Sequence, residues 1–430
     1  MKKKIAFHTF GCKLNFSETS SILRQFIEKD YHVVDMSEVA DIYVINTCTV
    51  TDNAEKKCIT AIKQAKKRNP DARIAVIGCF SQVNASEIAN IGGVDIIMGN
   101  VDKFDLQQKI EELGEPHSPE IYNQSINKET KFIPSFSAND RTRSFFKVQD
   151  GCDYFCTYCA IPHARGRSRS DTIKNTVETA KAIAAKGIKE IVLTGINLGE
   201  FGKNNDENLL MLIKELEKIK NIQRIRISSI EPNLINEKLI EFMSHSQTFL
   251  PHFHIPLQSG SNTVLKAMNR KYTRELFADK VEKIRKLIPH CCIACDIIVG
   301  FPGETDAHFT ETSDFLKQTP ISYAHVFSYS ERKHTASQHI FPKIPAKTIK
   351  ERSKSLHLFS EEKKMEFYRQ NIGYEARVLW ESDTENGFMY GFSDNYLRVK
   401  TKFNPILINE INNIHLTIID SDGIFIWNQE

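Results

Sequence analysis

The sequence lacks long apolar runs. None of its 430 residues belongs to a stretch approaching the ~20 apolar residues that a membrane-spanning helix needs. The basic start, Met1-Lys2-Lys3-Lys4, is followed by a short apolar stretch that ends at His8, which is too short for a signal-peptide core. We therefore expect a cytoplasmic protein without a membrane partner.

Internal repeats, low-complexity tracts and a large net charge are also missing. The net charge is only +3, and the contents of 41% hydrophobic and 26% charged residues are ordinary for a soluble globular chain. The length suits roughly two to four domains. Ten cysteines remain to be explained. In a reducing cytoplasm disulfides are rare, so the uneven clustering of these cysteines points to metal binding or catalysis.

Residues 1–115 alternate apolar, β-rich stretches with helix-like stretches, which predicts an α/β domain with a doubly wound parallel sheet. The expected strands are residues 4–9, 41–46, 73–78 and 94–98, with helices such as 17–29 and 54–68 between them. Residues 116–140 are rich in Pro, Ser, Asn and charge without a clear period, so we expect a linker there.

Residues 141–367 repeat the strand–helix alternation on a larger scale, which predicts a partial (β/α) barrel with its chemistry at the C-terminal strand ends. The expected strands are residues 145–148, 190–193, 224–228, 252–256, 293–299 and 323–327. Residues 371–430 contain short β-rich stretches between turn signals, which predicts a small antiparallel β-barrel. Its expected strands include residues 375–380, 396–400, 406–411 and 415–419.

The strongest local motif is Cys152, Cys156 and Cys159, spaced Cys-x3-Cys-x2-Cys on a loop after a predicted strand. Thiolates are the ligands of iron–sulfur clusters, and a four-iron cluster normally takes four of them. Three local ligands leave one iron open for a substrate or cofactor, by the logic of open metal sites. A zinc site is the alternative, but zinc sites favour two separated Cys-x2-Cys pairs.

A second set, Cys12, Cys48 and Cys79, is dispersed in the sequence, yet each cysteine closes a predicted strand. The carboxyl ends of parallel strands share one edge of a sheet, where ligands bind. These three cysteines are therefore candidates for a second cluster, although single cysteines are commonly inert core residues. We expect the other four (Cys58, Cys291, Cys292 and Cys295) to be structural residues and not metal ligands.

Several strings resemble those of the radical S-adenosylmethionine methylthiotransferase family, over nearly the whole chain. They are Thr9-Phe10-Gly11-Cys12-Lys13-Leu14-Asn15, Asn46-Thr47-Cys48-Thr49-Val50-Thr51, Ile77-Gly78-Cys79, the segment 151–166, His254-Ile255-Pro256-Leu257-Gln258-Ser259-Gly260-Ser261 and Gly300-Phe301-Pro302-Gly303-Glu304-Thr305. The resemblance implies an N-terminal α/β domain, a radical barrel and a C-terminal β module of the type called TRAM. The strings after Cys48 and Arg165 are most similar to the branch acting on N6-threonylcarbamoyladenosine in tRNA.

The resemblance implies two 4Fe–4S clusters and S-adenosylmethionine as cofactors. Cys12, Cys48 and Cys79 would hold the auxiliary cluster, and Cys152, Cys156 and Cys159 the cluster that cleaves S-adenosylmethionine. A methylthio group would then replace hydrogen at C2 of the adenine. That C2–H bond is neither acidic nor joined to a leaving group, so a cofactor must supply the reactivity. An external electron donor, a sulfur source and tRNA are the implied partners.

Candidate contacts for S-adenosylmethionine lie beside the third loop cysteine and at later strand ends, where a barrel gathers its ligands. They are Tyr158, Gly195, Asn197 and Gln258. The alternative is that the glycine serves a turn and that the polar groups satisfy loop backbone. No catalytic side chain beyond the cluster ligands is predicted.

Arginines around the cysteine loop are candidates for RNA phosphate contacts, because guanidinium groups suit phosphate. They are Arg141, Arg143, Arg165, Arg167 and Arg169. Residues 371–430, in contrast, hold nine acidic against four basic side chains (Arg377, Arg398, Lys400 and Lys402), which is unfavourable for phosphate binding.

Three functions are compatible with these residues. The first is methylthiolation of threonylcarbamoyladenosine in tRNA. The second keeps the chemistry but changes the substrate to isopentenyladenosine in tRNA or to a ribosomal protein. The third is a non-catalytic iron–sulfur protein that binds RNA or carries electrons.

Overall fold

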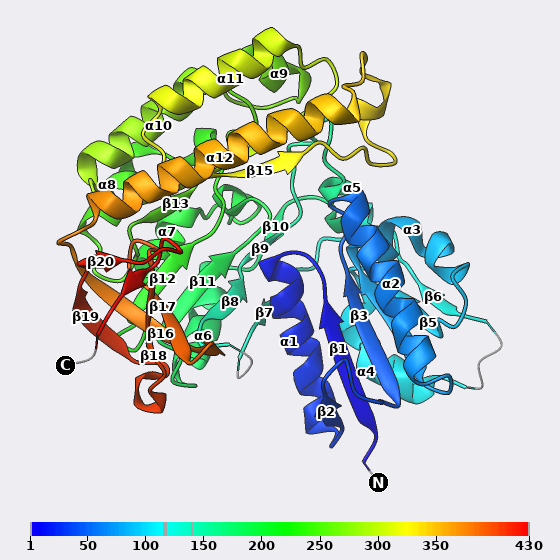
Figure 1. Cartoon of the computed structure of the whole chain (residues 1–430). Coiled ribbons are helices and arrows are strands. Elements are labelled where there is room, and N and C mark those ends of the chain that lie inside the picture. Colours follow the sequence, from blue (N-terminus) through cyan, green and yellow to red (C-terminus); the bar gives the residue numbers. More distant parts are fainter. Residues whose placement is uncertain (1, 115–117, 139–140, 429–430) are drawn as a thin grey trace. The chain divides into compact units, whose positions relative to one another are not determined.

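The computed structural model describes residues 2–114, 118–138 and 141–428. The chain divides into two compact units (Figure 1). Unit 1 comprises Met1–Ser137, Phe145–Asp171 and Ser330–Gln338, and unit 2 comprises Ala138–Ser144, Thr172–Tyr329 and His339–Glu430. Each unit contains hydrophobic clusters of its own. The domain boundaries expected from the sequence remain predictions.

Unit 1 is built on a six-stranded sheet in which all neighbouring strands run parallel. Its strands, in spatial order, are β2 (His32–Val34), β1 (Lys4–Thr9), β3 (Ile42–Thr47), β4 (Arg73–Gly78), β5 (Ile96–Met98) and β6 (Glu120–Tyr122). The order along the sheet reverses between β1 and β3. In open α/β sheets, ligands bind in the crevice outside the carboxyl ends of the strands at this point.

Helices cover both faces of this sheet, so the predicted doubly wound α/β fold is confirmed (Figure 1). Helices α2 (Asp52–Arg68) and α3 (Cys79–Ala89) pack on the face that carries Tyr43 and Ile45. Helices α1 (Lys13–Glu28) and α4 (Leu106–Glu112) pack on the face that carries Val44. Alternate residues of β3 thus face opposite layers, and all six are buried.

Short elements complete unit 1. They are η1 (Asp102–Asp105), η2 (Ile126–Lys128), β7 (Ser135–Phe136), β8 (Ser144–Lys147), β9 (Gln149–Asp150), α5 (Ile161–Arg165) and β10 (Arg169–Ser170). The segment expected to be a linker therefore contains β6, η2 and β7, although its residues 116, 117, 139 and 140 lie outside the described range. Strands β9 and β10 pair antiparallel and flank residues 151–168, which include the three loop cysteines.

Unit 2 contains the predicted partial barrel. Its parallel strands are β11 (Glu190–Thr194), β12 (Arg224–Ile227), β13 (His252–His254), β14 (Cys292–Val299) and β15 (Tyr323–Ser328). Isolated parallel bridges, Ile225 to Phe249 and Ser229 to His254, connect the β12 and β13 segments. The other expected barrel strand corresponds to β8, most of which belongs to unit 1.

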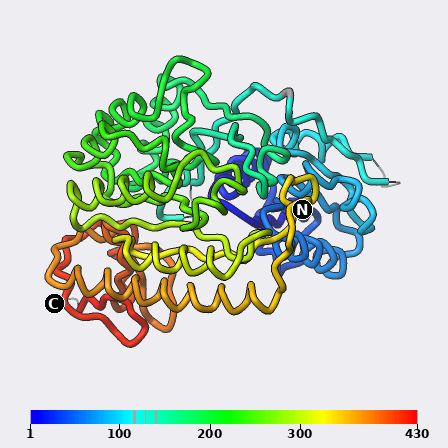
Figure 2. Tube along the Cα trace, turned by 90° about the horizontal axis from the view of Figure 1, so that it is seen from above, coloured from blue at the N-terminus to red at the C-terminus, as the bar shows by residue number. Residues whose placement is uncertain are grey.

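Helices alternate with the barrel strands, as the α/β pattern predicts. They are α6 (Ile173–Ala184), α7 (Leu209–Leu216), α8 (Glu237–His245), α9 (Asn262–Ala267), α10 (Arg274–Leu287) and α11 (Asp306–Gln318), with the short 3-10 helices η3 (Leu198–Glu200) and η4 (Pro232–Leu234). A further 3-10 helix, η5 (Ala336–His339), belongs mostly to unit 1. The long α12 (Ala346–Gln370) follows (Figure 2) and packs along β15 (Figure 1).

The C-terminal module of unit 2 is a curled six-stranded sheet, mostly antiparallel, which confirms the predicted class. Its strands are β16 (Glu375–Glu385), β17 (Phe388–Phe392), β18 (Arg398–Lys402), β19 (Ile411–His415), β20 (Ile418–Ile419) and β21 (Phe425–Ile426). Trp380 lies at its buried centre. The strand expected at residues 406–411 is wrong, because Pro405 begins the short helix η6 (Pro405–Leu407), which Asn404 caps.

Candidate metal centre

The dispersed cysteines follow three neighbouring strands at one edge of the unit 1 sheet. Cys12 follows β1 and is the N-cap of α1, Cys48 follows β3, and Cys79 follows β4 as the first residue of α3. Because β1, β3 and β4 are adjacent and parallel, their carboxyl ends meet at this edge. Two of the thiols, those of Cys12 and Cys79, also lie at helix N-termini.

The three thiols lie within electrostatic range of one another. Burial raises the pKa of the Cys48 thiol to about 12, and the charges of Cys79 and Cys12 act in the same direction. Gly11, with φ of +99°, lets the chain approach Cys48 closely: a Cβ there would lie 3.0 Å from the Cys48 sulfur. A side chain on residue 11 would therefore be both strained and obstructed.

Asparagine side chains fix the strand ends that carry these cysteines. Asn15 Nδ2 donates to the carbonyls of Phe10 and Thr47 at 2.8 and 3.0 Å, which connects the chain beside Cys12 to the chain beside Cys48. Asn46 Nδ2 donates to the Asn15 carbonyl at 3.1 Å. Both asparagines are buried. These bonds hold two thiol-bearing segments in a fixed relation before any ligand binds.

Two N–H groups point at cysteine sulfurs. The backbone N–H of Val50 donates to Cys48 Sγ, and Asn100 Nδ2 donates to Cys79 Sγ, each at 3.5 Å. Hydrogen bonds to ligand sulfurs tune iron–sulfur clusters. The high pKa of Cys48 means that its thiol is protonated at neutral pH without a cation, so metal binding there must release a proton.

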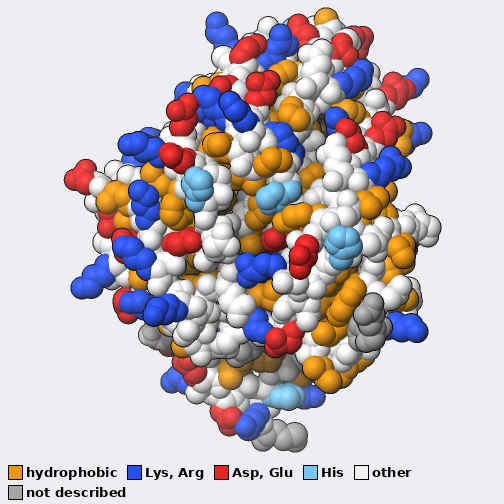
Figure 3. Space-filling view, turned by 90° about the vertical axis from the view of Figure 1, so that its left-hand side faces the viewer, with side chains coloured by type: hydrophobic (Ala, Val, Ile, Leu, Met, Phe, Trp, Pro, Cys, Tyr) orange, Lys and Arg blue, Asp and Glu red, His pale blue; other side chains and the backbone are white. Residues whose placement is uncertain are grey.

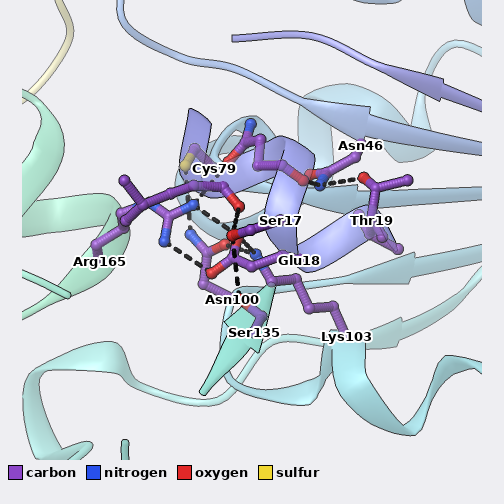
Figure 4. A network of polar contacts seen from close by, with 12 residues as sticks. Ser17, Glu18, Thr19, Asn46, Cys79, Asn100, Lys103, Ser135 and Arg165 are labelled. Atoms are coloured by element: carbon purple, nitrogen blue, oxygen red, sulfur yellow. Dashed lines mark hydrogen bonds and ion pairs between the residues drawn. The ribbon is translucent and has the colours of Figure 1, made fainter. Parts of the chain in front are cut away.

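A buried ion network lies beside this edge (Figure 4). Its members, hereafter the buried ion network, are Glu18, Lys103, Lys147, Asp150, Arg165 and Arg169. Arg165 is fully buried and bonds to Glu18 at 2.8 Å and Asp150 at 3.0 Å. Burial would raise the pKa of Glu18, but the charges of Arg165, Lys103 and Lys147 hold it well below its ordinary value. The same burial lowers the pKa of Lys103.

The Cys152–Cys159 segment forms a tight loop closed at both ends. Cys152 N–H donates to the Gly166 carbonyl, and Cys159 N–H donates to the Cys156 carbonyl, both at 3.0 Å. Tyr154 N–H donates to Cys152 Sγ at 3.5 Å. Ser337 N–H, from the separate segment of unit 1, donates to the Thr157 carbonyl at 2.8 Å.

Both cysteine sets suit an iron–sulfur cluster by the chemistry of their donors. Among the described residues, no three His, Cys, Asp or Glu side chains converge as ligands of one metal ion. A four-iron cluster does not require such convergence, since each thiolate binds its own iron atom. The thiol donors of each set, with N–H donors beside Cys48, Cys79 and Cys152, therefore suit an iron–sulfur cluster.

The remaining cysteines have the structural settings expected of them. Cys58 is buried in α2 against the sheet, and Cys291, Cys292 and Cys295 are buried at the start of β14. Burial raises the pKa of Cys58 and Cys292 to about 12, so both are inert thiols at neutral pH.

The candidate contacts for S-adenosylmethionine lie in both units. Tyr158 is half-buried on the cysteine loop of unit 1. Gly195 and Asn197 follow the carboxyl end of β11, and Gln258 follows β13 in unit 2. Gln258 has φ of +67°, and its backbone N–H donates to the Asp296 carbonyl at 2.7 Å. Their role remains a prediction.

The arginines expected to contact RNA differ in accessibility. Arg165 and Arg169 are buried and paired with Asp150, so RNA phosphate cannot reach them, and these two are wrong as phosphate contacts. Arg143 is 15% exposed and pairs with Glu381 at 2.9 Å. Arg141 and Arg167 are exposed, and Arg167 lies 4.4 Å from the Phe155 ring. These two remain the better candidates.

The C-terminal module offers few accessible cations. Lys400 is ion-paired with Asp420 and is only 13% exposed, while Arg398 stacks on Tyr390 at 4.0 Å. On the face shown in Figure 3, Lys and Arg side chains are interspersed with Asp and Glu, so neither sign of charge dominates that face. A broad basic patch for RNA is not visible on this face.

Within the described part of the chain, no helix has both the length and the apolar character to cross a bilayer. Comparison with known proteins gives two family matches. Residues 146–316 match the radical SAM superfamily, and residues 4–99 match uncharacterized protein family UPF0004. The fold resembles the radical S-adenosylmethionine methyltransferase TsrM from Kitasatospora setae, solved with cobalamin and a 4Fe–4S cluster. The TM-score is 0.54 at 14% identity, covering 99% of this chain and 87% of that one.

Two curated relatives align over nearly their full length. One is a threonylcarbamoyladenosine tRNA methylthiotransferase, MtaB, from Aquifex aeolicus, 41% identical over 92% of this chain and 96% of the relative. Another bears the same name in Bacillus subtilis, 41% identical over 95% of this chain and 92% of the relative.

The barrel and the Cys-x3-Cys-x2-Cys loop, together with the superfamily match, define a radical S-adenosylmethionine enzyme, a class whose fold implies a 4Fe–4S cluster and S-adenosylmethionine. Within that class, the full-length similarity places the chain in the threonylcarbamoyladenosine tRNA methylthiotransferase family. The resemblance noted in the sequence is thereby confirmed.

Several residues of the site were not predicted from the sequence. Glu18 and Lys103 look like ordinary surface charges in the sequence, because such residues are almost never fully buried unless they are paired. Asn15 and Asn46 lie within the sequence strings around Cys12 and Cys48, and this position was the signal that could have identified them as site residues. Asn100 has no comparable signal, since its partner Cys79 is 21 residues away.

Proposed function

We propose that this chain adds a methylthio group to C2 of N6-threonylcarbamoyladenosine beside the anticodon of tRNA. The observation that carries the proposal is full-length similarity, at 41% identity, to two enzymes named for this substrate. The proposal includes tRNA, an external electron donor and a sulfur source as partners. A cytoplasmic location follows, because tRNA is modified there.

In this proposal Cys12, Cys48 and Cys79 hold an auxiliary 4Fe–4S cluster, and Cys152, Cys156 and Cys159 hold the second one. The two clusters and S-adenosylmethionine would supply the radical chemistry and the sulfur that the unreactive C2–H bond requires. Support comes from the placement of all six cysteines in unit 1, three after adjacent strand ends and three on one closed loop.

The chain's own residues would position and protect these groups. Asn15 and Asn46 fix the strand ends, and Val50 and Asn100 donate hydrogen bonds to cysteine sulfurs. Tyr158, Gly195, Asn197 and Gln258 would contact S-adenosylmethionine. Arg141 and Arg167 would contact tRNA phosphate, since they are the exposed members of the arginine set.

Nucleoside mass spectrometry of tRNA from a deletion strain tests the substrate. We expect the methylthio form of threonylcarbamoyladenosine to disappear and the unmodified form to accumulate. If methylthio-isopentenyladenosine disappears instead, the substrate assignment within the family is wrong. Unchanged methylthio-nucleosides would refute tRNA as the substrate and favour a ribosomal protein.

Metal analysis tests the two-cluster arrangement. Anaerobically reconstituted protein should contain about eight irons, and the Cys152→Ala, Cys156→Ala, Cys159→Ala triple variant about four, on the basis of two four-iron clusters. With reductant and S-adenosylmethionine, the intact protein should form 5′-deoxyadenosine and the triple variant should not. A fully loaded protein that forms none would favour the non-catalytic iron–sulfur protein.

A further inference from the structure

The buried ion network is unbalanced. Four cations and two anions are joined by contacts between 2.5 and 3.5 Å, so cations exceed anions by two. All six side chains are at most 8% exposed. Charges removed from water are costly unless they are paired, so an excess of buried positive charge requires a nearby anion.

A further buried acid beside the network does not supply that anion. Asp102 is buried and borders the same small cavity as Lys147, Asp150 and Arg169. Its carboxylate accepts hydrogen bonds from the Gln124 backbone and side chain at 3.2 and 2.8 Å. Among the residues that the structure describes, no ion pair connects Asp102 to the four cations of the network.

Arg165 also interacts with the cysteine edge. The charge of Cys79 is the strongest attraction acting on the Arg165 guanidinium and helps to raise its pKa, against the effect of burial. Arg165 Nη2 also donates to Asn15 Oδ1 at 2.6 Å. Its Nε is buried and, within the described chain, has no hydrogen-bond partner. The unsatisfied Arg165 Nε–H is a second observation, beside the excess of positive charge, that indicates an anionic ligand near these thiols.

The network also connects the two cysteine sets through the chain. Arg165 ends α5, six residues after Cys159, and Asp150 stands two residues before Cys152. Glu18 lies on α1, the helix that Cys12 caps. Asn100 donates to Cys79 Sγ and to the Ala164 carbonyl at 2.8 Å, and its side-chain oxygen accepts from Lys103 at 2.7 Å (Figure 4).

We propose that the buried ion network is the counter-charge of the auxiliary cluster, with Arg165 as the positioning residue that couples that cluster to the Cys152–Cys159 loop. The inference deepens the proposed function, on which it rests. Three thiolates outnumber the positive charge of the usual cluster core, so the cluster with its ligands is an anion, and reduction makes it more negative. Arg165 therefore favours both retention and reduction of the auxiliary cluster.

The test uses the Cys152→Ala, Cys156→Ala, Cys159→Ala background, in which only the auxiliary cluster can remain. Arg165→Met removes the charge, and Arg165→Lys keeps the charge but loses the two-pronged geometry. Arg165→Met should leave the remaining network foldable, because three cations still accompany Glu18 and Asp150. Arg224→Met is the matched control, since Arg224 is also fully buried and pairs with Glu190 in unit 2.

Two readouts are measured: the rate of iron loss to a chelator, and the ratio of reduced to oxidised cluster at a fixed potential by electron paramagnetic resonance. Arg165→Met should lose iron about 10- to 100-fold faster, as expected for a residue that supports metal ligands. Its reduced-to-oxidised ratio should fall about tenfold, because one nearby positive charge is missing. Arg165→Lys should restore the ratio, and Arg224→Met should change neither readout.

The possible outcomes are distinct. An iron-loaded background in which Arg165→Met matches the parent overturns the inference alone. Equal iron loss in the Met and Lys variants with an unchanged ratio shows a merely structural role and also overturns it. An iron-free background overturns the proposed auxiliary site and this inference together. If Arg165→Met fails to fold, Lys103→Met replaces it, with a smaller shift expected in the same direction.

Discussion

The glycine before the first loop cysteine gives a sharp test of how the cysteine loop is built. Gly151 has φ of +69°, and a Cβ added there would lie 2.0 Å from the Arg167 carbonyl oxygen and 2.7 Å from the Gly166 carbonyl oxygen. Gly92, also in unit 1, has φ of +79°, and a Cβ there would meet nothing within 4 Å. Gly151→Ala and Gly92→Ala therefore impose the same kind of backbone strain, but only the Gly151→Ala side chain collides with neighbouring atoms.

The expected costs follow from this difference. The left-handed backbone costs each alanine variant roughly 1–2 kcal/mol. Gly151→Ala must in addition push the Arg167 backbone away by about 1 Å, which overpacks the site at roughly 1–3 kcal/mol. The displacement also breaks the bond from Cys152 N–H to the Gly166 carbonyl, a loss of about 1 kcal/mol. The total for Gly151→Ala is roughly 3–6 kcal/mol.

The assay compares the iron content, 5′-deoxyadenosine formation and urea midpoint of the two variants after anaerobic reconstitution. We expect Gly92→Ala to keep about eight irons and to cleave S-adenosylmethionine, with a slightly lower midpoint. Gly151→Ala should keep about four irons, form no 5′-deoxyadenosine and show the lower midpoint. Full iron and normal cleavage in Gly151→Ala would refute the close packing of Gly151 against the Arg167 carbonyl.

Three further predictions concern single side chains. Asn100→Leu removes the donor to Cys79 and the acceptor of Lys103, so iron loss from the auxiliary site should be about tenfold faster in a chelator assay, and an unchanged rate contradicts this role. The charges of three arginines outweigh burial and lower the pKa of Glu190 to about 2, so its stabilisation, about 3 kcal/mol, is complete above pH 4.5 and is lost as the pH falls towards 2. Glu190→Gln should remove that part of the acid dependence of the urea midpoint, and identical pH profiles argue against it. Arg167→Ala should weaken tRNA binding and lower the salt slope by about one, whereas an unchanged slope excludes a phosphate contact.

The main strands were predictable because their residues are both β-favouring and buried. Strands β1 and β4 coincide with the predicted ranges 4–9 and 73–78. Strand β2 has three residues, two of them exposed, so its local signal is too weak. Helix α3 was not predicted, since it begins directly at Cys79 and has a kink at Asn84, which disturbs the helical period.

The site was predictable where it depends on topology. Three strand ends in one parallel sheet had to share an edge, which is where the structure has Cys12, Cys48 and Cys79. The burial of Arg165 was not predictable, because its partner Glu18 lies 147 residues earlier in the chain. Local patterns describe a charged residue as exposed, and only tertiary contacts decide whether it is paired inside.

Unit 1 is assembled from pieces that are far apart in the chain. Segment Ser330–Gln338 contacts Glu55 and Thr49 through Arg332, and Thr157 through Ser337. A nascent chain of only the first 140 residues therefore contains neither the Cys152–Cys159 loop nor the segment Ser330–Gln338. All the residues of unit 1 are present only after residue 338 has been synthesised, and a fragment that ends at residue 140 contains only part of this unit.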